Sequence, residues 1–187
     1  MAPAGDDDDD ALEGVLIGGR EERPIEIVAY RPEWADRFAL EADRIRRALG
    51  ATARRVEHVG STAVPGLAAK PIVDVMVTVD DPDAESPYRE RLEAAGYVLR
   101  VREPGHRMFR TPERDVHVHL WAAGGDDETR HLAFRDRLRS SAADRAEYER
   151  TKRDLAGRYR DMNDYAEAKS DVIGAIMRRA RSGQQSD

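Results

Sequence analysis

The sequence predicts an α+β fold, in which strands with interleaved helix come first and a helical C-terminal half follows. Short runs with apolar side chains at alternate positions recur as far as residue 121, and this period is typical of β-strands. From Thr129 onward the apolar residues recur at the spacing of amphipathic helices. Strands grouped before a run of helices are typical of an α+β domain.

The elements before residue 122 follow from local patterns. Residues 25–30 are expected to form a strand, and Pro32 then opens a helix that Gly50 ends, because glycine suits the left-handed conformation at a helix C-terminus. The apolar face of this helix comprises Trp34, Phe38, Ile45 and Leu49. Further strands are expected at 54–59, 71–79, 97–101, 106–110 and 115–121, with a helix at 88–95.

We expect one domain, residues 25–180, between two flexible ends. Residues 1–24 are predicted to be a disordered acidic leader, because the five aspartates at 6–10 repel one another and lack an apolar pattern. Residues 181–187 are predicted to be a flexible polar tail. Within the domain, the C-terminal helices are expected to break near residues 140–141 and near Asp161.

Composition narrows the class of protein. Of 187 residues 36% are charged, and the formal net charge is −6. This mixed, slightly acidic balance argues against a protein that coats nucleic acid, so no nucleic-acid partner is expected. Cysteine is absent, which excludes disulfides and thiolate metal sites. No apolar run reaches membrane-spanning length, so we expect a cytoplasmic protein without a membrane partner.

Residues 56–77 carry the strongest functional signal. They predict a strand that ends in Gly60-Ser61, a tight loop, and an apolar strand that holds one acid, Asp74. Gly60 lets the backbone approach a ligand closely, and the hydroxyls of Ser61 and Thr62 suit an anion. A lone buried carboxylate is costly, so we expect Asp74 to bind a cation, to cap a helix, or to pair with Lys70 or an arginine.

This stretch resembles two known patterns. A Gly-Ser turn followed, after twelve residues, by an acid in an apolar strand is similar to the head motif of the nucleotidyltransferase superfamily. The longer string from His58 to Asp74, HVGSTAVPGLAAKPIVD, resembles the GrpB (UPF0157) family, whose domain also occurs fused to dephospho-CoA kinases. The match covers about residues 25–177 and continues through Gly96-Tyr97, Glu103, His106-Arg107, His117-Val118-His119, 134–136 and Lys169. It implies a nucleotidyltransferase-like mixed β-sheet with flanking helices.

One position departs from the superfamily pattern. That pattern implies a second carboxylate two residues after Asp74, where this chain has Met76. Two-metal nucleotidyl transfer uses paired carboxylates to hold the cations that clamp the attacking and leaving oxygens. With methionine in this place the usual metal site is incomplete, so catalysis is in question while the fold is not.

Two histidines offer another set of metal ligands. His117 and His119 share one face of a predicted strand, and the resemblance puts that strand near the position of the superfamily's third acid. With Asp74 they would suit Zn²⁺, Mn²⁺ or a similar ion, and Mg²⁺ is the remaining candidate. Alternatively, both imidazoles donate hydrogen bonds to Asp74 without a metal. No covalent cofactor is expected.

Basic residues near these motifs are candidates for phosphate binding. Lys70 directly precedes the Asp74 strand, where a phosphate would meet an ammonium and backbone N–H groups together. Arg107 and Arg110 could hold a triphosphate through bidentate hydrogen bonds. The alternatives are ordinary ion pairs, of Lys70 with Asp74 and of the two arginines with neighbouring glutamates such as Glu103.

Four more residues are weaker candidates for the pocket. His58 precedes the Gly-Ser turn and could act as a general base, although we favour a structural role for a lone histidine at a strand end. Arg135, Lys152 and Lys169 match the family pattern and could reach a cleft over the sheet. Charged residues on helices usually face solvent, so the family match alone distinguishes these three.

Two functions follow as hypotheses. The first is an enzyme that transfers a nucleotidyl group from a nucleoside triphosphate to an unknown acceptor, with Asp74, His119 and Glu103 as catalytic residues. The second is a binding or interaction module for a nucleotide, a CoA-type ligand or another phosphorylated small molecule, without catalysis. The fold does not decide between them.

Overall fold

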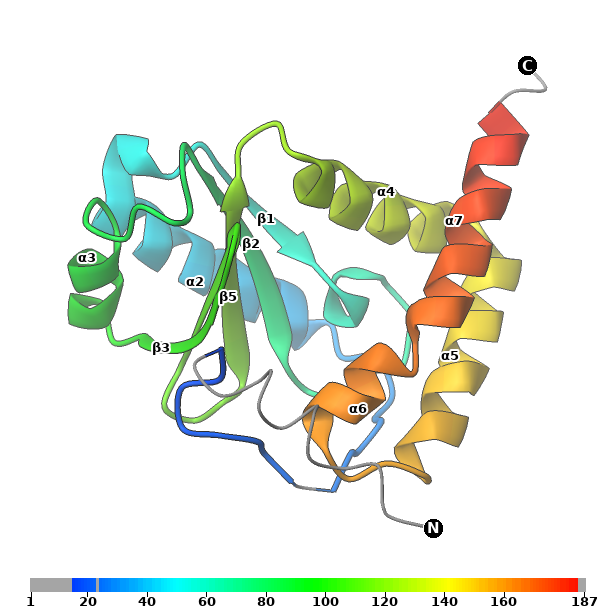
Figure 1. The fold of residues 1–187 in the computed structure, drawn as a ribbon. Helices are drawn as coiled ribbons and strands as arrows, with labels where there is room; N and C mark the ends of the chain where they lie inside the picture. The colour runs from blue at the N-terminus through cyan, green and yellow to red at the C-terminus, as the bar shows by residue number, and fades with distance from the viewer. Residues whose placement is uncertain (1–14, 23, 185–187) are drawn as a thin grey trace, which may run out of the picture.

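A five-stranded mixed sheet separates two groups of helices in the computed structural model, which describes residues 15–22 and 24–184 (Figure 1). The strands are β1 (Arg55–Val59), β2 (Val73–Val79), β3 (Val98–Glu103), β4 (His106–Arg110) and β5 (Val116–Ala122). Their order is β1-β2-β5-β4-β3; β2 and β5 are parallel, and the other neighbours are antiparallel. The predicted α+β fold is confirmed.

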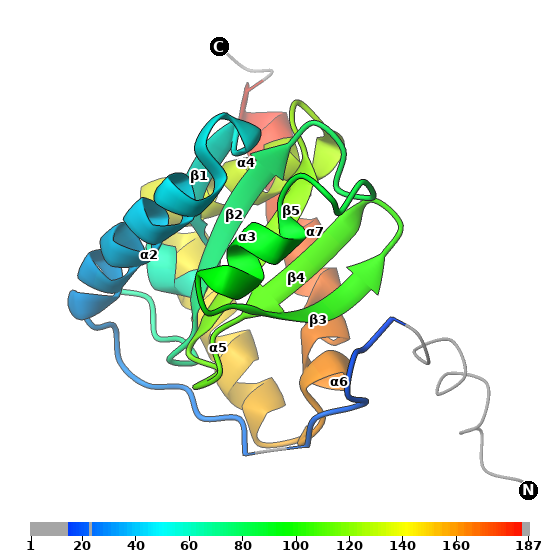
Figure 2. The same ribbon diagram turned by 90° about the vertical axis from the view of Figure 1, so that its left-hand side faces the viewer.

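One face of the sheet packs against α2 (Glu33–Leu49) and α3 (Arg89–Ala94), which lie across it in Figure 2. Alternate residues of β2 and β5 supply the sheet side of this core, and they are valines and a leucine because β-branched side chains suit a buried pleated surface. The largest cluster includes Ile45, Leu49, Val75, Phe109 and Val118, all buried. Each such side chain contributes about 1.5–3 kcal/mol on burial, so this face anchors the domain.

The other face looks toward α4 (Asp126–Ser140), α5 (Ala142–Ala156), α6 (Met162–Glu167) and α7 (Ser170–Gln184). The predicted helix breaks are confirmed, and both coincide with caps. Ser141 accepts a hydrogen bond from the backbone N–H of Asp144, and Asp161 accepts from those of Asn163 and Asp164. These helices have their own small core, which comprises Val64, Leu67, Leu138, Tyr148 and Ile176.

The predicted strand at residues 25–30 is wrong. This segment makes only one isolated bridge, in which the backbone N–H and C=O groups of Val28 exchange hydrogen bonds with those of Ala69. Ala69 belongs to the loop before β2 and not to a strand, so an extended segment finds no ladder to join. Local alternation specified the extended backbone but could not specify a partner.

The predicted leader, residues 1–24, is partly described. Residues 15–22 lie against the domain: Leu16 bridges to Val101 of β3, and Glu22 bridges to Asp161 before α6. Residues 1–14, like residues 185–187 of the predicted tail, lie outside the described residues. The last helix, α7, extends to Gln184. None of the helices in the described ranges has the length and apolar character needed to cross a bilayer.

Candidate functional site

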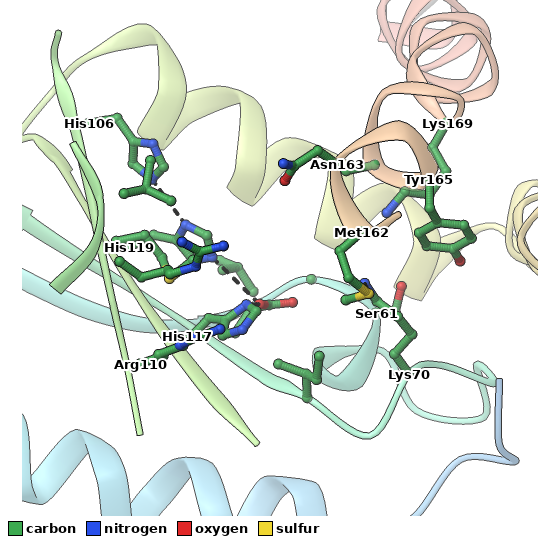
Figure 3. A pocket seen from close by; sticks show the side chains of 18 of the residues that line it. Ser61, Lys70, His106, Arg110, His117, His119, Met162, Asn163, Tyr165 and Lys169 are labelled. Atoms are coloured by element: carbon green, nitrogen blue, oxygen red, sulfur yellow. Dashed lines mark hydrogen bonds and ion pairs between the residues drawn. The ribbon is translucent and has the colours of Figure 1, made fainter. Parts of the chain in front are cut away.

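A cavity of about 510 Å³ lies between the sheet and α6. Its floor is formed by side chains that β2, β4 and β5 direct away from α2 and α3, because alternate residues of a strand face opposite sides. Asp74 lines this floor. His106, His117 and His119 rise from it, and Tyr165 and Lys169 come from the opposite wall (Figure 3). The Gly60–Asp74 stretch and the His117–His119 strand, which the sequence singled out separately, therefore line one cavity.

The Gly-Ser turn supports Asp74 from behind. Gly60 has φ 70° and begins the short 3₁₀ helix Ser61–Ala63. A Cβ atom at residue 60 would lie 2.4 Å from Oδ2 of Asp74. The close approach expected of this glycine is therefore an approach to the carboxylate, and any larger residue here would displace Asp74.

Asp74, His117 and His119 form a compact group of three metal-ligand types. Parallel pairing of β2 with β5 puts Asp74 beside His117, and His119 follows on the same face. Oδ1 of Asp74 lies 3.6 Å from Nδ1 of His117 and 3.5 Å from Nε2 of His119, and all three ligand atoms are within 4.8 Å of one another. Ligand atoms on a tetrahedral zinc ion are about 3.4 Å apart, so the group has the dimensions of a cation site.

The protonation states suit a cation. Burial alone would raise the pKa of Asp74, but His117 and His119 outweigh it and hold that pKa well below its usual range. Burial also lowers the pKa of His117, against the attraction of Asp74. Near neutral pH the group therefore offers an ionised carboxylate and a neutral imidazole, which are the forms that bind metals.

A chain of hydrogen bonds orients His119. Nδ1 of His106 lies 2.8 Å from Oε2 of Glu103, and Nε2 of His106 lies 3.1 Å from Nδ1 of His119. A carboxylate only accepts, so His106 donates from Nδ1; its Nε2 then accepts from Nδ1 of His119. Nε2 of His119 faces Asp74, and a cation bound beside the carboxylate would take its lone pair. Glu103 thus acts through His106 rather than directly at the centre.

An aromatic wall that the sequence reasoning missed adjoins this chain. Trp121 stacks on His119, with ring centroids 5.1 Å apart, and on His131 of α4, at 4.4 Å. Burial lowers the pKa of His131 to about 4. Trp121 continues the alternation of His117 and His119, a signal that could have found it. His131 lies on a separate helix, so no local pattern pointed to it.

The far wall of the cavity is basic. The sequence pointed to Lys70, Lys152, Lys169 and Ser61 as candidates, and all four line the cavity. Tyr165, which the sequence analysis missed, stands between two of these lysines: Nζ of Lys70 and Nζ of Lys169 lie 4.9 and 4.6 Å from its ring centroid. Three lysines from three segments thus face the Asp74 group across one cavity.

Arg110 and Arg107 separate to opposite faces of β4. Arg110 lines the cavity, where its guanidinium pairs with Glu21 of the N-terminal segment. Arg107 points to the other face and pairs with Asp83 and Glu85. The two arginines therefore cannot bind one triphosphate together, contrary to what the sequence led us to expect. The reason is the two-residue period of a strand, which the odd separation of three residues could have revealed.

Three other predicted pocket residues lie behind the Gly-Ser turn. Nε2 of His58 is 3.0 Å from the hydroxyl of Thr62, and its ring stacks on Phe38. Burial lowers the pKa of His58 to about 4, which agrees with the structural role we favoured. Arg135 donates to Glu57 and to the carbonyl of His58. These groups fix the loop and β1 rather than line the cavity.

Met76 occupies the position of the missing carboxylate. Its side chain is fully buried and packs with Val59 and Trp121, with Leu132 of α4 against them. The departure from the superfamily pattern is thus part of the core beneath α4. The described residues contain one group of three or more metal-ligand side chains, so they offer one candidate cation site.

Comparisons with known proteins agree with the resemblance stated from the sequence. A family model described as "GrpB protein" matches residues 24–179. A UPF0157 protein of Streptomyces coelicolor is 53% identical over 171 residues, which is 91% of each chain. A UPF0157 protein of Halalkalibacterium halodurans is 44% identical over 182 residues, covering 93% of this chain and 92% of the relative.

Two further matches concern a solved structure and a longer protein. The crystal structure of conserved protein GrpB from Enterococcus faecalis has a TM-score of 0.74 at 33% identity, and the match covers 86% of this chain and 100% of that one. A dephospho-CoA kinase of Mycolicibacterium paratuberculosis is 30% identical over 187 residues, covering 84% of this chain and 46% of the relative. Both matches were anticipated by the string from His58 to Asp74.

Proposed function

The chain belongs to the GrpB family, and on that premise we propose that it binds a nucleoside triphosphate with one divalent cation and transfers the nucleotidyl group to an acceptor. One observation carries the proposal: a carboxylate–histidine group and a lysine group face each other across one cavity. The volume of about 510 Å³ is within the range of small-molecule sites. No membrane or nucleic-acid partner forms part of the proposal.

The donor atoms support a cation of intermediate hardness. Asp74, His117 and His119 would hold it through one oxygen and two nitrogens, a set that suits Zn²⁺ or Mn²⁺ better than Mg²⁺, which prefers oxygen. When bound, such an ion would withdraw charge from phosphoryl oxygens. Glu103 and His106 keep the Nε2 lone pair of His119 directed at the ion, because they define its tautomer.

The lysines supply the other half of the proposed chemistry. Transfer forms a bond from an acceptor nucleophile to the α-phosphorus and breaks the bond to the pyrophosphate oxygen. Lys70, Lys152 and Lys169 would hold the leaving phosphates and neutralise the charge that develops on them. Gly60 and Ser61 line the same cavity, where they would orient the chain of phosphates.

A second candidate function is a binding module for a nucleotide or a CoA-type ligand, without catalysis. The buried Met76 favours it, since the described residues provide no second carboxylate beside Asp74. The name of the longer relative, dephospho-CoA kinase, makes a CoA-type ligand a reasonable probe.

Thermal stability with a panel of ligands separates the two. Nucleoside triphosphates, dephospho-CoA and CoA would each be tested with Zn²⁺, Mn²⁺, Mg²⁺ or EDTA, on the wild type and on Asp74→Asn. A ligand at a hundredfold its Kd adds about 2.7 kcal/mol of stability, which gives a visible shift. Asp43→Asn is the matched control, because this exposed acid lies on α2, behind the sheet.

The outcomes divide as follows. A cation-dependent shift with one triphosphate that is lost in Asp74→Asn but kept in Asp43→Asn supports the transferase, and release of pyrophosphate with a panel of acceptors would then be measured. A shift that persists in EDTA, without turnover, favours the binding module. The absence of any shift in the wild type contradicts both.

A further inference from the structure

Lys70, Lys169 and Tyr165 lie on the wall of the cavity opposite His117 and His119 (Figure 3), and Lys152 lines the same cavity. We infer that Lys70, Lys152, Lys169 and the Tyr165 hydroxyl form an oxoanion subsite, and that Lys152 takes up a proton when a tetrahedral dianion enters it. The inference deepens the proposed function and rests on it for one point only, namely that the natural ligand is phosphorylated.

Tyr165 provides the first observation. Its side chain is 1% exposed, and within the described part of the chain its buried hydroxyl has no hydrogen-bond partner. A buried hydroxyl without a partner is destabilising, so such groups are rare unless a ligand or water completes them. Burial raises the pKa of Tyr165 to about 12, so the hydroxyl remains a donor. The ring that carries this donor lies against the ammonium groups of Lys70 and Lys169, so the hydroxyl belongs to a basic wall.

Lys152 provides the second observation. It is 2% exposed, and its Nζ donates a hydrogen bond to the backbone carbonyl of Ala68 and lies 5.0 Å from the ring centroid of Tyr148. Both partners are uncharged. Burying an ammonium group costs free energy, and a carbonyl and an aromatic ring offset this cost less than a carboxylate would.

The charged groups around Lys152 come from three segments. Lys70 approaches from the loop before β2, and Lys169 from the junction of α6 and α7. On α5 itself are Arg153 and Glu149, and the carboxylate of Glu149 is engaged by Arg153 and by the backbone N–H of Ala68. Cations therefore outnumber the acid around Lys152.

The consequence is a lysine that is easily deprotonated. Burial first, and then Lys169, lower the pKa of Lys152 to about 7, although Glu149 opposes this. Burial likewise lowers the pKa of Lys169. A dianion placed among the three lysines would replace repulsion by attraction and raise the pKa of Lys152 again, so the bound state holds one more proton. Anion binding should therefore weaken as the pH rises above 7.

Sulfate is the probe that isolates this step. It has the tetrahedral shape and double charge of a phosphoryl group, but its own charge does not change near neutral pH. EDTA would be present, so that a contaminating cation at Asp74 contributes nothing. The Kd for sulfate, measured by tryptophan fluorescence and by thermal shift, should rise about eightfold between about pH 7.5 and 8.5 if one proton is taken up by a group with a pKa near 7.

Two variants make the test specific. Lys152→Arg keeps a cation that cannot titrate in this range, so its Kd for sulfate should be nearly independent of pH. Tyr165→Phe removes only the hydroxyl and should weaken sulfate binding about tenfold without lowering the unfolding midpoint. Should Lys152→Arg fail to fold, Lys152→Met keeps the aliphatic stem and is expected to bind sulfate weakly at every pH.

Three results would overturn the inference: no sulfate binding in the wild type, an eightfold dependence that persists in Lys152→Arg, or an unchanged affinity in Tyr165→Phe. Failure of the proposed function is separate from these, because it is measured as absence of metal-dependent turnover with a nucleoside triphosphate. Sulfate binding with the expected pH dependence in a protein that lacks turnover would support the subsite and the binding module together.

Discussion

Nε2 of His106 lies 3.1 Å from Nδ1 of His119, and the second nitrogen of each ring faces a carboxylate, that of Glu103 or Asp74. The four groups thus form one line from the β3–β4 turn to the candidate cation site. His119 can present a lone pair toward Asp74 only while His106 accepts the proton on its other nitrogen.

Removing the acceptor in this line should weaken metal binding without touching a ligand. His106→Phe keeps a flat ring against Trp121 but cannot accept from His119. We expect the Kd for Zn²⁺ to rise about 10–100-fold, as is usual when a hydrogen-bond partner of a metal ligand is removed. Competition with a chromophoric chelator would measure it. Phe109→Leu, which alters an aromatic contact with Tyr88 on the other face of the sheet, is the control, and equal affinities in both variants would contradict the role assigned to His106.

Gly60 tests whether the turn positions Asp74. Gly60→Ala should lose Zn²⁺ binding, because the new Cβ would lie 2.4 Å from Oδ2 of Asp74 and displace the carboxylate. Gly66→Ala is a matched control: Gly66 also has a positive φ, 79°, but a Cβ there meets nothing within 4 Å.

Both glycine variants should lose about 1 kcal/mol of stability from backbone strain, and the Gly60 variant should lose more because of the collision. Chemical denaturation measures this part. Wild-type metal affinity in Gly60→Ala would mean that the carboxylate tolerates displacement, and the proposed geometry would then be wrong.

Met76 tests whether a second carboxylate can be restored. Met76→Asp places an acid where the superfamily pattern has one, but this side chain is fully buried with Val59 and Trp121. We expect a loss of about 4 kcal/mol of unfolding free energy and no second bound metal. Met76→Leu should cost less than about 1.5 kcal/mol, since the volume is conserved. A stable Met76→Asp protein that binds two metal ions per chain would contradict this expectation. It would show that α4 can move to admit a second carboxylate, and it would support a two-metal mechanism.

Glu85 gives a pH dependence that is independent of the cavity. It accepts hydrogen bonds from Arg102 and Arg107, and these arginines lower its pKa from 4.5 to about 2, with Arg102 contributing most. The unfolded chain binds the proton more readily, so this contribution is fully present above about pH 4.5 and is lost as the pH falls toward 2. Glu85→Gln should therefore cost about 2 kcal/mol at neutral pH and progressively less in acid.

Denaturant titrations from pH 7 down to about pH 3 would measure the Glu85 effect. The control is Asp127→Asn, whose exposed carboxylate pairs with Arg130 on the surface of α4, away from Glu85. A difference between wild type and Glu85→Gln that stays constant over this range would exclude the ion pairs as its cause.

The repeating patterns of the chain were readable from the sequence. The helix that ends at Gly50, the strands around Asp74 and His119, and the breaks near residues 141 and 161 were all predicted, because each depends on residues within one or two turns of one another. Residues 25–30 were predicted wrongly, because a strand needs a partner that alternation does not name.

The candidate site was predictable where one strand or one loop holds the residues. His117 and His119 share a face by the period of two, and the Gly-Ser turn was identified from its glycine. The same rule, applied more strictly, would have separated Arg107 from Arg110. These properties belong to the local backbone, so neighbouring residues in the chain are enough to predict them.

The contacts between groups that are distant in the sequence come from the packing of whole elements. The parallel pairing of β2 with β5 puts Asp74 beside His117, and the return of α6 and α7 over the sheet brings Tyr165 and Lys169 to the same cavity. No local period encodes these contacts, since they depend on how the apolar faces of separate elements pack. The pKa of Lys152 is lowered because this packing buries its side chain, so the shift cannot be predicted before the fold is known.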